Sequence, residues 1–161
     1  FHPQVLDQFL NGRIEMMPVL PKAVNTLVQF PGCDIQGGIA VAIVNSELFG
    51  KVIARALSLI GLKVTVVKSD AMGDKLEIIS TAQVIVSVCG RPGLISITDL
   101  RPDAIVVDAG ITRVNGEVRG DIAGDKQKYT GWITPIPGGV GPLTIACLLE
   151  RVVFMAKQRK A

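Results

Sequence analysis

The sequence predicts an α/β protein with a Rossmann-type, doubly wound and mostly parallel sheet in a single domain. Residues 39–44 (IAVAIV) form a continuous apolar run between Gly37-Gly38 and Asn45-Ser46, which is typical of a strand covered on both faces. Residues 49–60 follow with apolar side chains at helical spacing and a closing glycine, and residues 63–67 form a valine-rich second strand. Strand, helix and strand in this order define a β-α-β unit, in which the two strands lie parallel.

The other elements continue this alternation. Residues 1–21 contain three prolines and little periodicity, so we expect an extended lead-in with at most one turn there, whereas residues 22–30 have the apolar spacing of a short helix. Asn115-Gly116 is a turn signal between two short antiparallel segments. The remaining expected elements are a helix over 74–80, strands over 84–88, 104–108 and 132–134, a helical turn over 98–100 and a final helix over 143–157.

Composition excludes several classes of protein. Of 161 residues, 48% are hydrophobic and 19% charged, so the chain is not disordered and can bury a core. No uninterrupted apolar run reaches the roughly 18 residues of a membrane span. A net charge of +3 with 4% aromatic residues argues against a nucleic-acid partner.

Cysteine and histidine usage limits the chemistry. Cys33, Cys89 and Cys147 form no CxxC pair, and the last two lie in apolar segments, so we expect buried, reduced thiols as in the cytosol. His2 is the one histidine and stands at the N-terminus, which excludes a histidine-based metal site or a histidine-activated nucleophile.

A dense proline–glycine segment precedes the final helix. Residues 134–144 (TPIPGGVGPLT) hold three prolines and three glycines, and Pro142 stands where a helix tolerates a missing N–H. Such a loop is stiff, and its bare backbone can approach a flat ligand. A binding loop is therefore favoured over a simple helix entry.

Four further segments follow predicted strands, where open α/β sheets bind ligands. In residues 44–50, helix N–H groups and the Ser46 hydroxyl can receive phosphate oxygens, or Ser46 can simply cap the helix. In residues 68–70, Lys68 and Ser69 favour a 2′-phosphate on the ribose, whereas Asp70 favours a free hydroxyl. The glycines of residues 89–93 and 108–111 would let a dinucleotide lie against the backbone.

Together these segments resemble the cofactor-binding part of the methylenetetrahydrofolate dehydrogenase/cyclohydrolase family. The resemblance runs in order over nearly the whole chain, and its last motif is close to diagnostic. It rests on Phe1-His2-Pro3, residues 44–50, Gly90-x-Pro92-Gly93, Val107-Asp108-x-Gly110-Ile111, Gly120-Asp121-Ile122 and residues 133–144 (ITPIPGGVGPLT).

The resemblance implies a cofactor, NADP or alternatively NAD, and a folate substrate that is oxidised from the methylene to the methenyl form and then hydrolysed to the formyl form. It also implies a homodimer in the cytoplasm, with a mitochondrial location left open. The implied cofactor contacts are Val44, Asn45, Ser46, Ser69 and Ile111. The implied contacts at the folate and nicotinamide are Pro137, Gly138, Gly139, Val140, Gly141, Pro142, Leu143 and Thr144.

The sequence departs from the family pattern at several positions near the expected cofactor, and no residue matches the family's catalytic lysine. Val44 and Asn45 stand where the family usually has glycine and an arginine or small residue, Val52 replaces a proline, and Lys68 replaces a histidine. The catalytic lysine belongs to an N-terminal domain, so no catalytic residue is assigned here, and Tyr129 is expected in a polar surface loop. Residues 18–21 (PVLP) likewise stand in place of the family's Pro-Cys-Thr-Pro.

Two alternatives follow from these departures. In the first, residues 1–35 are a lead-in and linking helix from that catalytic domain, and residues 36–161 bind the dinucleotide. In the second, the chain is a degenerate, non-catalytic module kept for dimerisation or packing. A short-chain dehydrogenase is excluded because the one tyrosine is not followed by lysine at the fourth position.

Overall fold

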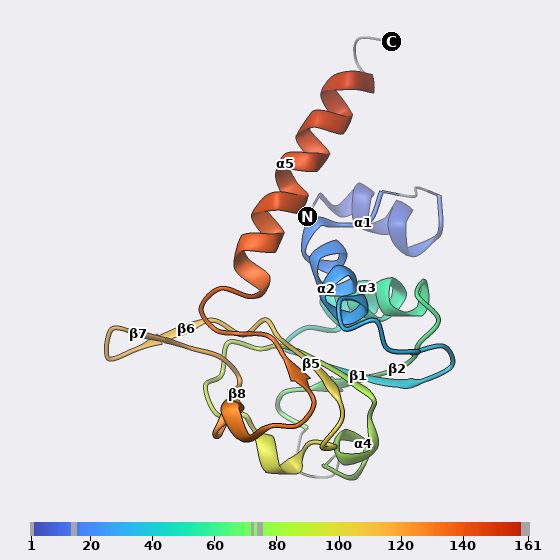
Figure 1. Cartoon of the computed structure of the whole chain (residues 1–161). Helices are drawn as coiled ribbons and strands as arrows, with labels where there is room; N and C mark the ends of the chain where they lie inside the picture. The colour runs from blue at the N-terminus through green and yellow to red at the C-terminus, as the bar shows by residue number, and fades with distance from the viewer. Residues whose placement is uncertain (1, 14–15, 72, 74–75, 159–161) are drawn as a thin grey trace.

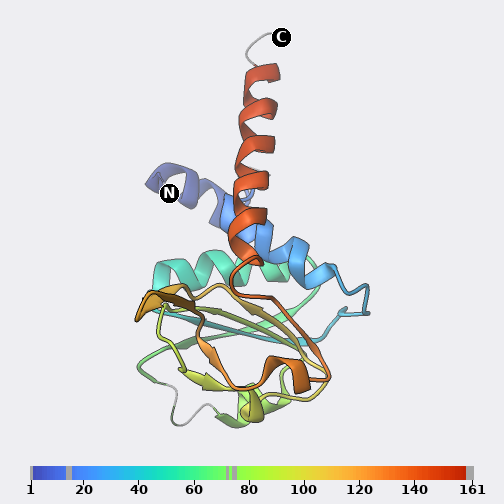
Figure 2. The ribbon, with the colours of Figure 1, turned by 60° about the vertical axis from the view of Figure 1, so that its left-hand side comes forward.

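A computed structural model describes residues 2–13, 16–71, 73 and 76–158. Five parallel strands form the central sheet in the order β2-β1-β3-β5-β9, with helices α2 and α3 over one face and α4 on the other (Figures 1 and 2). The predicted Rossmann-type fold is thus confirmed. Strand order reverses between β1 and β3, which is the switch point where such sheets bind ligands.

The strands are β1 (Ile39–Val44), β2 (Lys63–Lys68), β3 (Val84–Val88), β5 (Ile105–Asp108) and β9 (Trp132–Ile133). Side chains of β1 alternate between the two halves of the core: Ala40 and Ala42 face the α2 and α3 layer, while Val41 and Ile43 face the α4 side. All four are fully buried, which explains why this strand has an uninterrupted apolar sequence.

Helix α3 (Glu47–Ser58) connects β1 to β2. It begins two residues before the predicted position because Ser46 caps it, accepting a hydrogen bond from the backbone of Phe49 at 3.3 Å. Gly50 lets this helix approach the sheet: a Cβ there would lie 2.6 Å from Cγ1 of Val66 and 3.1 Å from Cγ2 of Val44. The chain leaves the helix through Gly61, whose φ of 90° favours glycine.

The expectation of an extended lead-in was wrong at residues 3–10 and 19–21, which are helical. Helix α1 (Pro3–Leu10) buries Leu6 and Phe9 against Val52 and Ala56 of α3. Pro3 occupies the first turn, where proline favours rather than breaks a helix. Helix α2 (Val19–Gln29) begins three residues earlier than expected, with Pro21 inside its first turn.

The remaining elements follow the predicted order. Helix α4 (Leu76–Thr81) matches the expected helix over 74–80 except at residues 74 and 75, which lie outside the described residues. Strands β6 (Thr112–Val114) and β7 (Glu117–Arg119) pair antiparallel around Asn115-Gly116, as predicted. The expected turn is the 3₁₀ helix η2 (Ile97–Asp99), and three elements were not predicted: β4 (Ile95–Ser96), its parallel partner β8 (Ile122–Ala123) and the 3₁₀ helix η3 (Lys126–Lys128).

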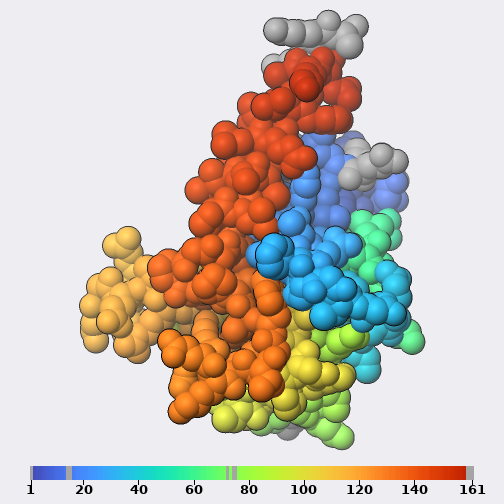
Figure 3. Space-filling view, in the orientation of Figure 1, coloured from blue at the N-terminus to red at the C-terminus, as the bar shows by residue number. Residues whose placement is uncertain are grey.

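Helix α5 (Val140–Gln158) begins three residues before the predicted start and stands away from the sheet beside α2 (Figures 1, 2 and 3). Within the described part of the chain, no helix combines the length and apolar character that a bilayer crossing requires. Cys89 and Cys147 are buried free thiols, as predicted, and Cys33 is an exposed one. Tyr129 differs from expectation: it is partly buried, and its hydroxyl donates hydrogen bonds to two carbonyls.

Candidate functional site

The candidate site lies at the carboxyl ends of β1, β2 and β3, and Asn45 joins these three strand ends. Its Nδ2 donates to the carbonyl oxygen of Cys89 at 2.5 Å, and its Oδ1 accepts from Oγ of Ser69 at 2.7 Å. The backbone N–H of Ser69 also donates to the carbonyl of Val44 at 3.0 Å. Three predicted site residues, Val44, Asn45 and Ser69, therefore meet with Cys89 at the strand ends beside the switch point.

Val44 contributes to this site through its backbone. Its side chain is completely buried and points toward Gly50, within the contact between α3 and the sheet. Valine in place of the family's glycine thus does not narrow the space in front of the helix. Ser46 occupies the cap of α3, so both of its predicted roles are compatible: the hydroxyl oxygen accepts from the helix, and its proton can be donated to a ligand.

The N-terminus of α3 is the natural place for an anion, because its N–H groups and dipole favour negative charge. Glu47 in the first turn does not cancel this charge by itself, since its carboxylate pairs with Lys51 at 2.8 Å. The hydrogen bond from Lys51, together with the charges of Lys51 and Lys68, lowers the pKa of Glu47 from its ordinary value. Because the Glu47–Lys51 pair is neutral as a whole, the positive charge that remains beside the loop is that of Lys68.

Two buried carboxylates hold the loops that border the site. Oδ2 of Asp121 accepts from Oγ of Ser87 at 2.7 Å and from the Cys89 N–H at 2.8 Å, while Oδ1 accepts from the Arg91 N–H at 2.7 Å. Asp108 likewise accepts from the backbone N–H of Asp121 at 3.0 Å. These bonds fix the path of residues 87–91 and 108–122 at the strand tips.

Burial raises the pKa of two groups in this cluster, Asp108 and Cys89. Desolvation raises the pKa of Asp108, and the bonds from two backbone N–H groups and the charge of Lys126, 3.4 Å away, only partly oppose it. Burial also raises the pKa of the Cys89 thiol, to which the charge of Asp121 contributes. Cys89 is therefore a protonated, structural thiol rather than a nucleophile.

The proline–glycine loop lies exposed beside the same edge of the sheet. Thr134 anchors it: this buried hydroxyl accepts from the Asp108 N–H at 2.9 Å. Beyond that anchor, Pro137 follows a cis peptide bond, and Gly138 adopts a φ of 108°. Of the predicted substrate-contact residues, Val140 alone is buried, while Pro137, Gly138 and Pro142 are exposed and Gly139, Gly141, Leu143 and Thr144 are half-buried.

A hollow of about 400 Å³ opens between this loop and the strand-tip loops. Its lining includes Pro92, Gly93, Gly120, Lys126 and Ile136. Ile111, the remaining predicted contact, does not line this hollow, and its side chain is 59% exposed.

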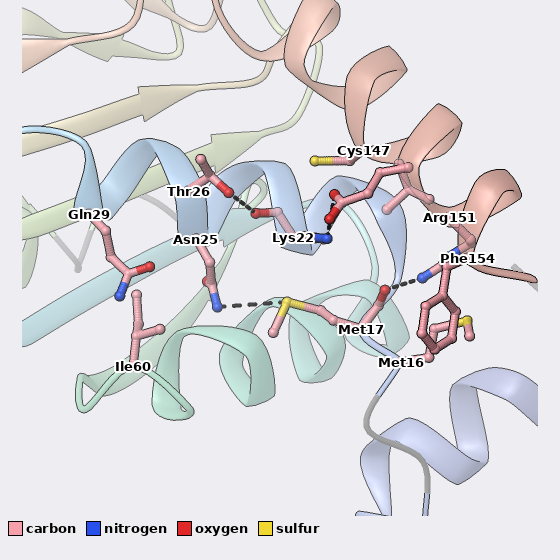
Figure 4. A pocket seen from close by; sticks show the side chains of 12 residues that line it. Met16, Met17, Lys22, Asn25, Thr26, Gln29, Ile60, Cys147, Arg151 and Phe154 are labelled. Carbon is pink, nitrogen blue, oxygen red and sulfur yellow. Dashed lines mark hydrogen bonds and ion pairs between the residues drawn. The ribbon is translucent and has the colours of Figure 1, made fainter. Parts of the chain in front are cut away.

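A larger hollow, of about 810 Å³, lies between α2 and α5. Figure 4 shows its side chains: Lys22 pairs with Glu150 at 2.6 Å, Arg151 donates to the Met17 carbonyl, and Met16 and Phe154 also line the hollow. None of the predicted site residues lines it. Its position over the helical layer, away from the strand tips, separates it from the candidate cofactor site.

Helix α5 extends this second surface. Seven of its large apolar side chains are at least 46% exposed: Ile145, Leu148, Leu149, Val152, Val153, Phe154 and Met155. Monomeric proteins seldom leave so many apolar side chains exposed on one element. Among the described residues there is also no group of three His, Cys, Asp or Glu side chains placed to hold a metal ion.

The parallel sheet, its switch point and the helix N-terminus that follows β1 define a Rossmann-type dinucleotide-binding domain. Residues 18–160 match the model of the tetrahydrofolate dehydrogenase/cyclohydrolase, NAD(P)-binding domain. The chain belongs to this family, and the resemblance seen in the sequence is confirmed.

Individual relatives agree with the family assignment. The bifunctional protein FolD of Acidithiobacillus ferrooxidans is 38% identical over 99% of this chain, which covers 56% of that protein. Among solved structures, the Trypanosoma brucei N5,N10-methylenetetrahydrofolate dehydrogenase-cyclohydrolase, complexed with NADP cofactor and inhibitor, matches with a TM-score of 0.86 at 30% identity, covering 98% of this chain and 57% of that one. FolD from Campylobacter jejuni matches with a TM-score of 0.85 at 33% identity and the same coverage. The chain thus spans a little over half the length of these relatives.

The described residues fit the cofactor that names this family. Gly50 brings the first turn of α3 against the sheet, Ser46 and Ser69 offer hydroxyls at the tips of β1 and β2, and the hollow beside Ile136 is open to a ring. Sequence reasoning missed Asp121 and Arg91 as residues with a part at the site. Their contacts join segments 22 to 34 residues apart, and no local pattern signals such contacts.

Proposed function

We propose that this chain is the cofactor-binding part of an enzyme that oxidises methylene-tetrahydrofolate to methenyl-tetrahydrofolate and hydrolyses the product to formyl-tetrahydrofolate. The observation that carries the proposal is the joined switch point, where Asn45 and Ser69 link three strand ends beside the capped helix α3. Family membership supplies the reaction.

The proposed roles follow from position. Helix N–H groups behind Ser46 would receive the pyrophosphate, Ser69 would face the adenosine ribose, and Ile111 would contact a ring. Residues 137–144 would pack against the nicotinamide and the folate. When bound, NADP would supply the acceptor for the hydride that leaves the methylene carbon.

We assign the acid–base groups to a separate catalytic domain, for which this chain offers a docking surface. The exposed apolar face of α5 and the groove between α2 and α5 are the surface that such a domain would cover. Residues 1–35 would link the two domains, and residues 36–161 would form the cofactor domain. Without that partner, the chain should orient the cofactor but not turn over substrate.

The assembly is proposed to be a homodimer in the cytoplasm. Three free thiols fit a reducing compartment. The antiparallel β6-β7 ribbon, which extends sideways from the body (Figure 1), is the surface that we propose for self-association.

The degenerate-module alternative loses its main support, because the Val44 side chain points into the core and not toward the phosphate position. Calorimetric titration with NADP, combined with an assay for reduced nicotinamide, tests the proposal. We expect a saturable heat with NADP and no turnover of methylene-tetrahydrofolate by the chain alone. Absence of NADP binding would contradict cofactor binding, whereas turnover by the isolated chain would contradict the separate location of the catalytic groups.

A further inference from the structure

The loop after β1 provides no positive charge for the end of β2. Asn45 is neutral, and both ends of its amide are engaged by Cys89 and Ser69. It therefore has no charge to offer a phosphate and serves instead to join the strand ends. A cation at this place must come from Lys68 of β2 or from another segment.

Arg91, in the loop after β3, is placed to supply it. The Arg91 backbone is held by the 2.7 Å bond from its N–H to Asp121, at the point where the loop leaves the sheet. From there the side chain crosses to β2, and its Nη1 lies 3.5 Å from the carbonyl oxygen of Ser69. That distance is long for a hydrogen bond, so the guanidinium keeps donors for a ligand.

The tip of β2 is where a Rossmann-type domain meets the adenosine ribose, at the position that distinguishes NADP from NAD. Lys68 and Arg91 bring two positive charges to this tip, and the exposed Asp70 brings one negative charge. A planar guanidinium with paired N–H donors matches the geometry of a phosphate better than an ammonium does.

We infer that Arg91 is the specificity-determining residue of this domain, which binds the 2′-phosphate of NADP beside Ser69 and so favours NADP over NAD. The inference rests on the proposed dinucleotide binding. It adds a residue from the loop after β3 to the contacts expected from the loops after β1 and β2. Arg91 acts in binding and takes no part in the chemistry of hydride transfer.

The test compares the dissociation constants of NADP and NAD, and of adenosine 2′,5′-bisphosphate and 5′-AMP, for the unaltered protein and for Arg91→Gln. We expect the unaltered protein to prefer the 2′-phosphorylated member of each pair. Arg91→Gln should reduce that preference by about tenfold or more, the effect of one lost hydrogen bond to a charged group, and leave the affinity for NAD unchanged. Arg91→Lys should retain part of the preference.

Lys63→Gln is the matched control, because Lys63 is an exposed cation at the opposite end of the same strand. It should leave the preference intact, and thermal melting should show all variants folded. Equal loss of NADP and NAD binding in Arg91→Gln, or an unchanged preference, would overturn the inference. Failure of the unaltered protein to bind any of the four nucleotides would instead overturn the proposed function, and the inference with it.

Discussion

Replacement of Asp121 by asparagine tests whether a buried carboxylate holds the strand-tip loops together. Asp121 is completely buried and accepts three hydrogen bonds, from Ser87, Cys89 and Arg91, at 2.7 to 2.8 Å. An amide keeps one accepting oxygen, so its NH₂ group must face at least one of these donors. Asp121→Asn therefore loses one bond and removes the charge from the other two.

The loss of one charge-assisted bond costs about 2 kcal/mol, and the two remaining bonds weaken by about 1 kcal/mol each. The substitution also removes the repulsion between the charges of Asp121 and Asp108, which offsets part of this loss of stability. We expect a net fall of about 3 kcal/mol in the free energy of unfolding.

Urea unfolding followed by the fluorescence of Trp132, the one tryptophan, measures this change. The matched control is Asp103→Asn. Asp103 also uses its carboxylate to pair with a neighbour, Arg101, but its side chain is 65% exposed to solvent. This exposed pair should contribute less than about 1 kcal/mol. If Asp121→Asn costs no more than the control, the carboxylate does not organise the site.

Three further predictions concern burial elsewhere in the chain. Alkaline titration of Tyr129, the one tyrosine, should show a midpoint near pH 12 by ultraviolet absorbance, because burial raises its pKa to about 12; a midpoint near 10 would place the ring in solvent. Burial raises the pKa of Asp108 above its ordinary 3.8, so the stability that this carboxyl contributes is complete below pH 3.8 and is lost as the pH rises through the folded-state pKa. The free energy of unfolding of the unaltered protein should therefore fall relative to that of Asp108→Asn as the pH rises from 3.8 through that pKa. A relative rise over the same pH range would contradict the raised pKa. Phe9→Ala should reduce the hydrogen-exchange protection of α1 by about 3 kcal/mol because Phe9 is 2% exposed, whereas Gln8→Ala on the exposed face should change it little; equal effects would contradict the docking of α1 on α3.

The doubly covered strands could be predicted from the sequence because their local pattern and their environment agree. Strands β1 and β3 have the predicted bounds, since every position but their ends is buried on one face or the other. The buried state of Cys89, just after β3, and of Cys147, in α5, followed from the apolar residues around each of them. The resemblance to the family rested above all on residues 133–144, a local motif that needs no knowledge of tertiary contacts, and the family match spans residues 18–160.

The elements that the sequence did not predict depend on distant contacts. Helix α1 has only two buried side chains, Leu6 and Phe9, and their packing depends on α3, which lies against them. Strands β4 and β8 are two residues each and pair across the cluster that Asp121 organises. The contact of Arg91 with the end of β2 likewise exists only because the strand order places β1 between β2 and β3, which brings their tips to one edge.

Hydrogen exchange with and without NADP is the most direct test of the central claim that the strand-tip edge binds the dinucleotide. NADP should protect the backbone at residues 44–50, 68–71 and 89–93, and leave the groove between α2 and α5 unchanged. Protection confined to the groove lined by Met17 and Phe154, with none at the strand tips, would contradict it.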